Sequence, residues 1–135
     1  MGPGLVCRWI LLCVLFSVWS SSHASGWKLI AEEDISDIYI RLDSSSGKSW
    51  TVDLLINFKR PQTIGKTFRS SIDRMEFNCQ TSEVRTLVMK NFTGQMGTGS
   101  VIFETTQQTE WKPIEAGSVN AVLLNIGCEN RKSWT

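Results

Sequence analysis

The stretch Ser49-Trp-Thr-Val-Asp-Leu-Leu-Ile-Asn-Phe58 decides the fold. Apolar residues stand at every second position from Trp50 to Phe58, and most of the residues between them are polar. Because successive side chains of a strand point to opposite faces, this period of two predicts a strand with one buried face and one largely wet face. Asp37–Asp43 shows the same pattern, and the turn-forming residues 44–48 join the two strands as a hairpin.

Four more stretches outside this hairpin are predicted to be strands: Trp27–Glu32, Arg74–Cys79, Val84–Phe92 and Ser100–Thr106. The stretch Val84–Phe92 is apolar on both faces, which is typical of a central or doubly covered strand. A loop is predicted for Arg60–Gly65, because Pro61 stands near its start. The glycine-containing stretch Asn91–Gly99 is interpreted as a flexible hairpin loop, since a phosphate-binding loop would be followed by a helix.

One helix is predicted, close to the C-terminus. Ser118 suits the N-cap position, four apolar residues follow with helical spacing, and Gly127 suits the C-terminal end. A helix this short gains its stability by packing an apolar face on the sheet. The predicted fold class is therefore α+β: an antiparallel sheet of about six strands with one C-terminal helix packed on it.

The N-terminal residues are predicted to be a secretory signal peptide, residues 1–24, with cleavage between Ala24 and Ser25. Arg8 precedes an uncharged, largely apolar run of 11 residues, and small residues occupy positions 22 and 24. A membrane anchor is not expected, because a spanning helix needs about 20 apolar residues. Lipidation at Cys13 is not expected either, because Leu12 stands where a lipidation site carries a small residue.

After cleavage, residues 25–135 are expected to form a single domain. Loss of Arg8 leaves 13 basic against 13 acidic residues. A neutral chain without a polybasic segment predicts neither nucleic-acid binding nor membrane insertion. Two cysteines remain, Cys79 and Cys128, and an even pair in an exported protein predicts a disulfide, which would tie the helix to the end of a strand.

The absence of histidine from residues 25–135 bears most directly on function, since the one histidine, His23, lies in the signal peptide. Nucleophile–histidine pairs, histidine general bases and histidine metal sites are thereby excluded. We expect no enzyme activity, catalytic residue, metal or cofactor. The one local concentration of charge is basic, from Lys59 to Arg69, and presents a candidate patch for an acidic partner, with a solvated strand edge as the alternative interpretation.

Two blocks carry a family resemblance: Phe68–Cys79, which ends Phe-Asn-Cys, and Trp111–Cys128. Together with the glycine-containing stretch near residues 97–101, they resemble the surface-adhesin protein E-like family of Gram-negative bacteria, over residues 27–128. The resemblance implies a six-stranded antiparallel sheet with a C-terminal helix held by the disulfide. It also implies a non-enzymatic, envelope-associated binding protein.

Under this resemblance the expected partner is an extracellular-matrix or envelope protein, and Lys66 and Arg69 are the candidate ligand-binding residues. The expected location is the periplasm or the cell surface, without a lipid anchor. The alternative is a soluble periplasmic accessory or structural protein with no host ligand. The oligomeric state is left open.

Overall fold

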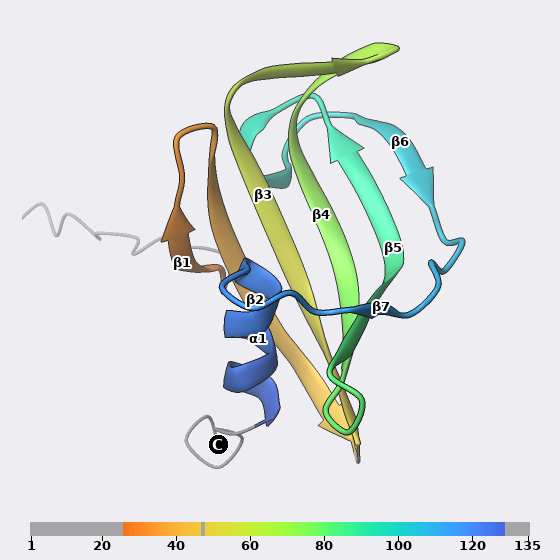
Figure 1. The fold of residues 1–135 in the computed structure, drawn as a ribbon. Coiled ribbons are helices and arrows are strands. Elements are labelled where there is room, and N and C mark those ends of the chain that lie inside the picture. The colour runs from red at the N-terminus through yellow and green to blue at the C-terminus, as the bar shows by residue number, and fades with distance from the viewer. Residues whose placement is uncertain (1–25, 47, 129–135) are drawn as a thin grey trace, which may run out of the picture.

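The computed structural model describes residues 26–46 and 48–128. The predicted signal peptide and its cleavage site at Ala24 and Ser25 lie outside these residues. The described chain forms one antiparallel sheet and a C-terminal helix (Figure 1). Its elements are β1 (Lys28–Glu32), β2 (Ser36–Ser46), β3 (Ser49–Ile64), β4 (Lys66–Asn78), β5 (Glu83–Phe92), the 3-10 turn η1 (Gln95–Gly97), β6 (Val101–Thr105), β7 (Lys112–Pro113) and α1 (Val119–Cys128).

The strands lie in the sheet in the order in which they occur in the chain, β1 to β6, and the short strand β7 pairs with the other end of β5. Every pairing is antiparallel. The predicted fold class and hairpin are therefore confirmed. The long central strands β3 and β4 extend beyond their neighbours at one end of the sheet (Figure 1).

The hydrophobic core lies between α1 and one face of the sheet. The predicted alternation is confirmed here, because Trp50, Val52 and Leu54 of β3 are all buried on this face. Leu123 of α1 packs against them and has no exposed surface. The core also takes in Ile38, Ile40, Met75, Phe77 and Val84. Burial of apolar surface is the main favourable term in such a fold.

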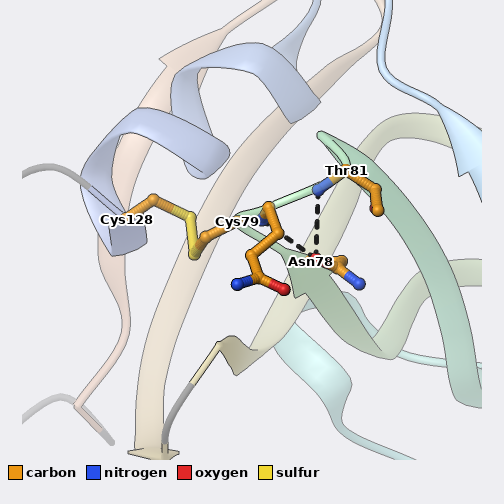
Figure 2. Close-up of a disulfide and its surroundings, with 5 residues drawn as sticks. Asn78, Cys79, Thr81 and Cys128 are labelled. Carbon is orange, nitrogen blue, oxygen red and sulfur yellow. Dashed lines mark hydrogen bonds between the residues drawn. A yellow bond between two sulfur atoms is a disulfide. The ribbon is translucent and has the colours of Figure 1, made fainter.

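A disulfide joins α1 to the sheet, as predicted. Cys79 follows the last residue of β4 and is bonded to Cys128, the last residue of α1, with 5.6 Å between the two Cα atoms. Figure 2 shows the bond beside the turn that follows β4, in which the Asn78 side-chain oxygen accepts a hydrogen bond from the backbone N–H of Thr81. At the other end of the helix, the Ser118 hydroxyl accepts a hydrogen bond from the backbone N–H of Ala121, which confirms the predicted N-cap.

The opposite face of the sheet is partly covered by η1. Ser70 of β4 is fully buried there; its hydroxyl donates a hydrogen bond to the Gly94 carbonyl and accepts one from the Gly97 N–H. Gly97 has a φ of +70°, and a Cβ at this position would press on Ile72 beneath it. The predicted flexible loop between β5 and β6 is thus a defined turn held by side chains from β3 and β4.

Two strand predictions were wrong. Residues 60–64, predicted as loop, belong to β3, and residues 66–73, for which no strand was predicted, form the first part of β4. Pro61 is tolerated because it lies within the register shift between Asn57 and Gln62, where β3 and β4 make no regular ladder. Within the described residues, no helix has the length and apolar character that crossing a membrane requires.

Candidate binding surface

The hairpin formed by the far ends of β3 and β4 dominates one end of the molecule. Its tip bends across the top of the sheet toward the side on which β5 and β6 lie (Figure 1). The register shift between Asn57 and Gln62 of β3 interrupts the flat ladder at the base of this bend. Phe58 and Phe68 meet edge to face, with ring centroids 5.6 Å apart, and hold the two strands together at the same point.

A groove of about 430 Å³ opens between this hairpin and strands β5 and β6. We call it the apical groove. Its lining is mostly apolar, and it comes from three separate parts of the chain: Ile64, Gly65, Lys66 and Phe68 of the hairpin; Met89 and Asn91 of β5; Ile102 and Phe103 of β6. Such concave apolar surfaces are the usual form of a ligand site.

Large apolar side chains stand exposed around the apical groove. Ile64 at the hairpin tip is 79% exposed, and Phe103 on β6 is 50% exposed. Scattered exposed apolar residues are normal on proteins, but two large ones that line the same groove indicate an interaction site.

Strand β6 adds backbone groups to this surface. Within the part of the chain that the structure describes, β6 pairs with β5 alone, so its other side is a free edge. A free edge presents unpaired N–H and C=O groups, and an extended peptide can add to it as a further strand. The arrangement can therefore bind a protein segment through main-chain hydrogen bonds and seat its apolar side chains in the groove.

The two candidate residues from the sequence lie in different settings. Lys66 is exposed and lines the apical groove. Arg69 is half-buried and does not line the groove; its Nε–H has no hydrogen-bond partner among the described residues. Lys59, at the start of the basic stretch, pairs with Asp37 at 3.6 Å. The structure thus brings one of the two candidates to the groove and spreads the remaining charge over the hairpin.

A buried carboxyl lies next to the apical groove. The strand register places Asp73 of β4 between Leu54 of β3 and Met89 of β5, and the side chain is buried. Burial raises the pKa of the Asp73 carboxyl, and the hydrogen bond donated by the Ser71 hydroxyl, at 2.7 Å, lowers it only in part. Among the described residues, no cation adds to these two effects on the pKa of Asp73, so its buried carboxyl has no compensating positive charge there.

A second polar cluster lies on the face opposite α1, centred on Asp53. Its carboxylate oxygens accept hydrogen bonds from Arg41 Nη2 and Arg74 Nε, each at 2.9 Å. Burial alone would raise the pKa of Asp53, but the hydrogen bonds and charges of the two arginines outweigh it and hold the pKa below its usual range. Arg41 of β2, Asp53 of β3 and Arg74 of β4 are direct cross-strand neighbours. The pairing of the three strands therefore brings these side chains together.

Sequence reasoning missed most of the residues that line the apical groove. Ile64 was assigned to a loop, and Phe103 appeared as one residue of a short strand. Neither residue belongs to a sequence motif that indicates a binding site. They come together only because the bent hairpin and β6 form opposite walls of the groove. Among the described side chains, no three His, Cys, Asp or Glu residues gather in a geometry that would hold a metal ion.

Comparison with known proteins gives a consistent result. The family model described as surface-adhesin protein E matches residues 27–129. A search of curated protein sequences finds no match.

Solved structures show the same fold. The crystal structure of protein E from non-typeable Haemophilus influenzae superimposes with a TM-score of 0.63 at 14% identity, covering 81% of this chain and 79% of that one. A second crystal form of Haemophilus influenzae protein E gives a TM-score of 0.60 at 14% identity, covering 78% and 89%.

Proposed function

Because this chain belongs to the surface-adhesin protein E family, we propose that it is an exported, non-enzymatic binding protein that recognises a protein ligand outside the cytoplasm. One observation carries the proposal: the apical groove, with exposed apolar side chains and a free strand edge beside it. The Cys79–Cys128 disulfide supports export, because disulfides persist in oxidising compartments.

In this proposal an extended segment of the ligand adds to the free edge of β6. Alternate side chains of that segment would enter the groove and contact Phe103 and Met89. Ile64 would close over them from the hairpin tip. Lys66 would contribute mainly to the rate of association with an acidic ligand, since rim charges steer the encounter more than they add to affinity.

The proposal is tested with the purified, oxidised protein and immobilised matrix proteins: fibronectin, laminin and collagen. The double variant Ile64→Ser, Phe103→Ser is expected to lose at least about tenfold in affinity for the protein that binds, since truncation of an apolar anchor costs 1 to 2 kcal/mol or more. Val122→Ser is the matched control, because Val122 is equally exposed but lies on α1. Equal losses in both variants, or none in either, would contradict the role of the groove.

The charged candidates are tested separately. Lys66→Gln should slow association and weaken its salt dependence while leaving dissociation nearly unchanged. Arg69→Gln should have a smaller effect on association, because this side chain is half-buried away from the groove. Binding that keeps its rate and salt dependence in both variants would show that neither cation takes part.

The proposed location has its own test. A displayed protein should disappear when intact cells are treated with an external protease, and N-terminal sequencing should begin at Ser25. Complete protection by the intact cell would contradict surface display and favour the periplasmic accessory role. A chain that still begins at Met1 would contradict the signal peptide.

A further inference from the structure

A buried carboxamide lies in the floor of the apical groove. Asn91 of β5 lines the groove and is only 9% exposed, whereas Ile64 and Phe103 stand exposed at the rim. Within the part of the chain that the structure describes, the Asn91 side chain makes no hydrogen bond. The rest of the lining is apolar apart from Lys66, which is exposed. Asn91 is therefore the neutral polar group that this lining turns toward a ligand.

The strand register explains why Asn91 stays unsatisfied. Residues directly opposite one another on paired strands share a face, and Asn91 lies between Ser71 of β4 and Phe103 of β6. The Ser71 hydroxyl donates its hydrogen bond to Asp73, at 2.7 Å. The Phe103 ring on the other side has no polar atom to offer. The donor and the acceptor of the Asn91 carboxamide thus both remain available to a group that enters the groove.

Folding alone gives no reason for an asparagine at this position. Most buried polar side chains are hydrogen-bonded, and a buried polar group without a partner lowers stability. A leucine has a similar size, and it would fill the same place without that penalty. Residues that break such a rule at a cost in stability are typical of functional sites. The hydrogen-bonding capacity of Asn91 therefore indicates a polar group of the ligand.

The chemistry of Asn91 narrows the choice of that group. A carboxamide presents a donor and an acceptor side by side, so a second carboxamide matches both. A charged group at this depth would lose its hydration to a mostly apolar lining. A strand added to the free edge of β6 would lie two strand spacings from β5, roughly 10 Å, so that only a long side chain reaches Asn91. Glutamine is the longer of the two carboxamide side chains.

We infer that Asn91 determines the specificity of the apical groove by receiving a glutamine side chain of an extended protein ligand through paired amide hydrogen bonds. The inference rests on the proposed function and deepens it, because it names the side chain that the groove selects. In an extended segment, the residues two positions before and after the glutamine point the same way. Apolar residues at those positions meet the apolar lining.

The test uses the purified, oxidised protein and fluorescein-labelled heptapeptides, followed by fluorescence polarisation. The first peptide is Ser-Val-Thr-Gln-Thr-Val-Ser, which places a valine on the same face on each side of the glutamine. Three further peptides carry Met, Glu or Lys in place of Gln, at similar length. The Gln peptide is expected to bind about tenfold more tightly than the Met peptide, because only the Gln peptide satisfies both groups of Asn91. The Glu and Lys peptides should bind more weakly than the Gln peptide.

Asn91→Leu gives two readouts of opposite sign. It should bring the affinities for the Gln and Met peptides within about twofold of each other, and it should raise the urea midpoint, because an unsatisfied amide leaves the interior. A residue with a purely structural role would lower the midpoint when replaced. Asn125→Leu is the matched control, since Asn125 is exposed on α1, and it should leave the preference for glutamine unchanged.

The outcomes separate this inference from the proposed function. If the Met peptide binds as tightly as the Gln peptide, and Ile64→Ser, Phe103→Ser abolishes both, the inference is overturned while the groove remains a ligand site. A preference for the Glu or the Lys peptide would overturn it as well, and so would a lower urea midpoint for Asn91→Leu. If none of the peptides binds, the groove is not a site for extended segments, and the inference and the proposed function are contradicted together.

Discussion

Gly127 shows how one residue sets the distance between the helix and the sheet. It lies inside α1, where its backbone approaches the indole of Trp50 so closely that a Cβ would overlap the ring. Trp50 in turn stacks on Phe77, with ring centroids 5.2 Å apart, and both are buried. The indole therefore has no free space into which it can move. Gly127 lies in the last turn of α1, at the C-terminal end where the sequence placed it, and it is also required for this close approach.

Gly127→Ala is accordingly expected to destabilise the protein by about 2 kcal/mol or more, although alanine is the better helix former, because overpacking a filled core forces the helix away. Urea denaturation measures the effect. Asn125→Ala, at an exposed position of the same helix, should be neutral or stabilising. A Gly127→Ala variant as stable as the parent would show that α1 does not press on Trp50.

Asp73 sets a pH dependence of stability. A carboxyl whose pKa is raised in the folded state stabilises the fold below the unfolded pKa of about 3.9, and this contribution is lost as the pH rises through the folded pKa. Asp73→Asn removes the ionisation and keeps an oxygen that accepts the Ser71 hydrogen bond. The variant should therefore be more stable than the parent at pH 7, and the difference should vanish below about pH 3.9.

The urea midpoints of the parent protein and of Asp73→Asn are measured from pH 7 down to below about pH 3.9. Asp34→Asn is the control, because Asp34 is exposed. A parent protein that is more stable than Asp73→Asn at pH 7 would mean that the ionised carboxylate has a stabilising partner in the folded protein.

At the scale of elements, the disulfide ties α1 to β4 across 49 residues of sequence. By the chain-entropy model, closing such a loop contributes about 4 kcal/mol. Replacing both cysteines by alanine should lower the free energy of unfolding by about that amount and leave the strands formed. Chemical denaturation followed by circular dichroism measures it. A loss below about 1 kcal/mol would indicate that the packing of Leu123 and Gly127 alone holds the helix.

The strands were predictable where the sheet has one dry and one wet face. Trp50, Val52 and Leu54 alternate with polar residues because α1 covers one side only. The helix was predictable from Ser118 and from the apolar spacing after it, both of which are local signals.

The first part of β4 was not predictable in this way. Its buried positions include Ser70, Ser71 and Asp73, which look solvent-exposed in the sequence. The Ser70 hydroxyl makes its hydrogen bonds with backbone groups of Gly94 and Gly97, more than 20 positions away in the sequence. A local sequence pattern cannot predict such distant partners. The far end of β3 was missed because Pro61 indicates a break, and only the register shift makes it acceptable within a strand.

At the scale of the whole molecule, the apical groove and the cluster around Asp53 each bring together residues that lie far apart in the sequence, and the pattern of a single strand does not reveal such contacts. The cluster around Asp53 needs the strand register that aligns Arg41, Asp53 and Arg74. The apical groove needs the hairpin to bend over β5 and β6. The family could be predicted from the sequence, whereas the apolar residues around the groove could not. Lys66 lines the groove, and its role in ligand binding stays a prediction.

The proposed function requires that a protein ligand bind at the apical groove. It is tested most directly by placing a photo-reactive phenylalanine analogue at position 103, and in a second protein at position 122, and irradiating living cells exposed to the matrix protein panel. Ligand binding at the groove should give a covalent adduct with another protein at position 103, which Ile64→Ser weakens, and none at position 122. Equal adducts at both positions, none at position 103, or an adduct of two copies of this chain would contradict it.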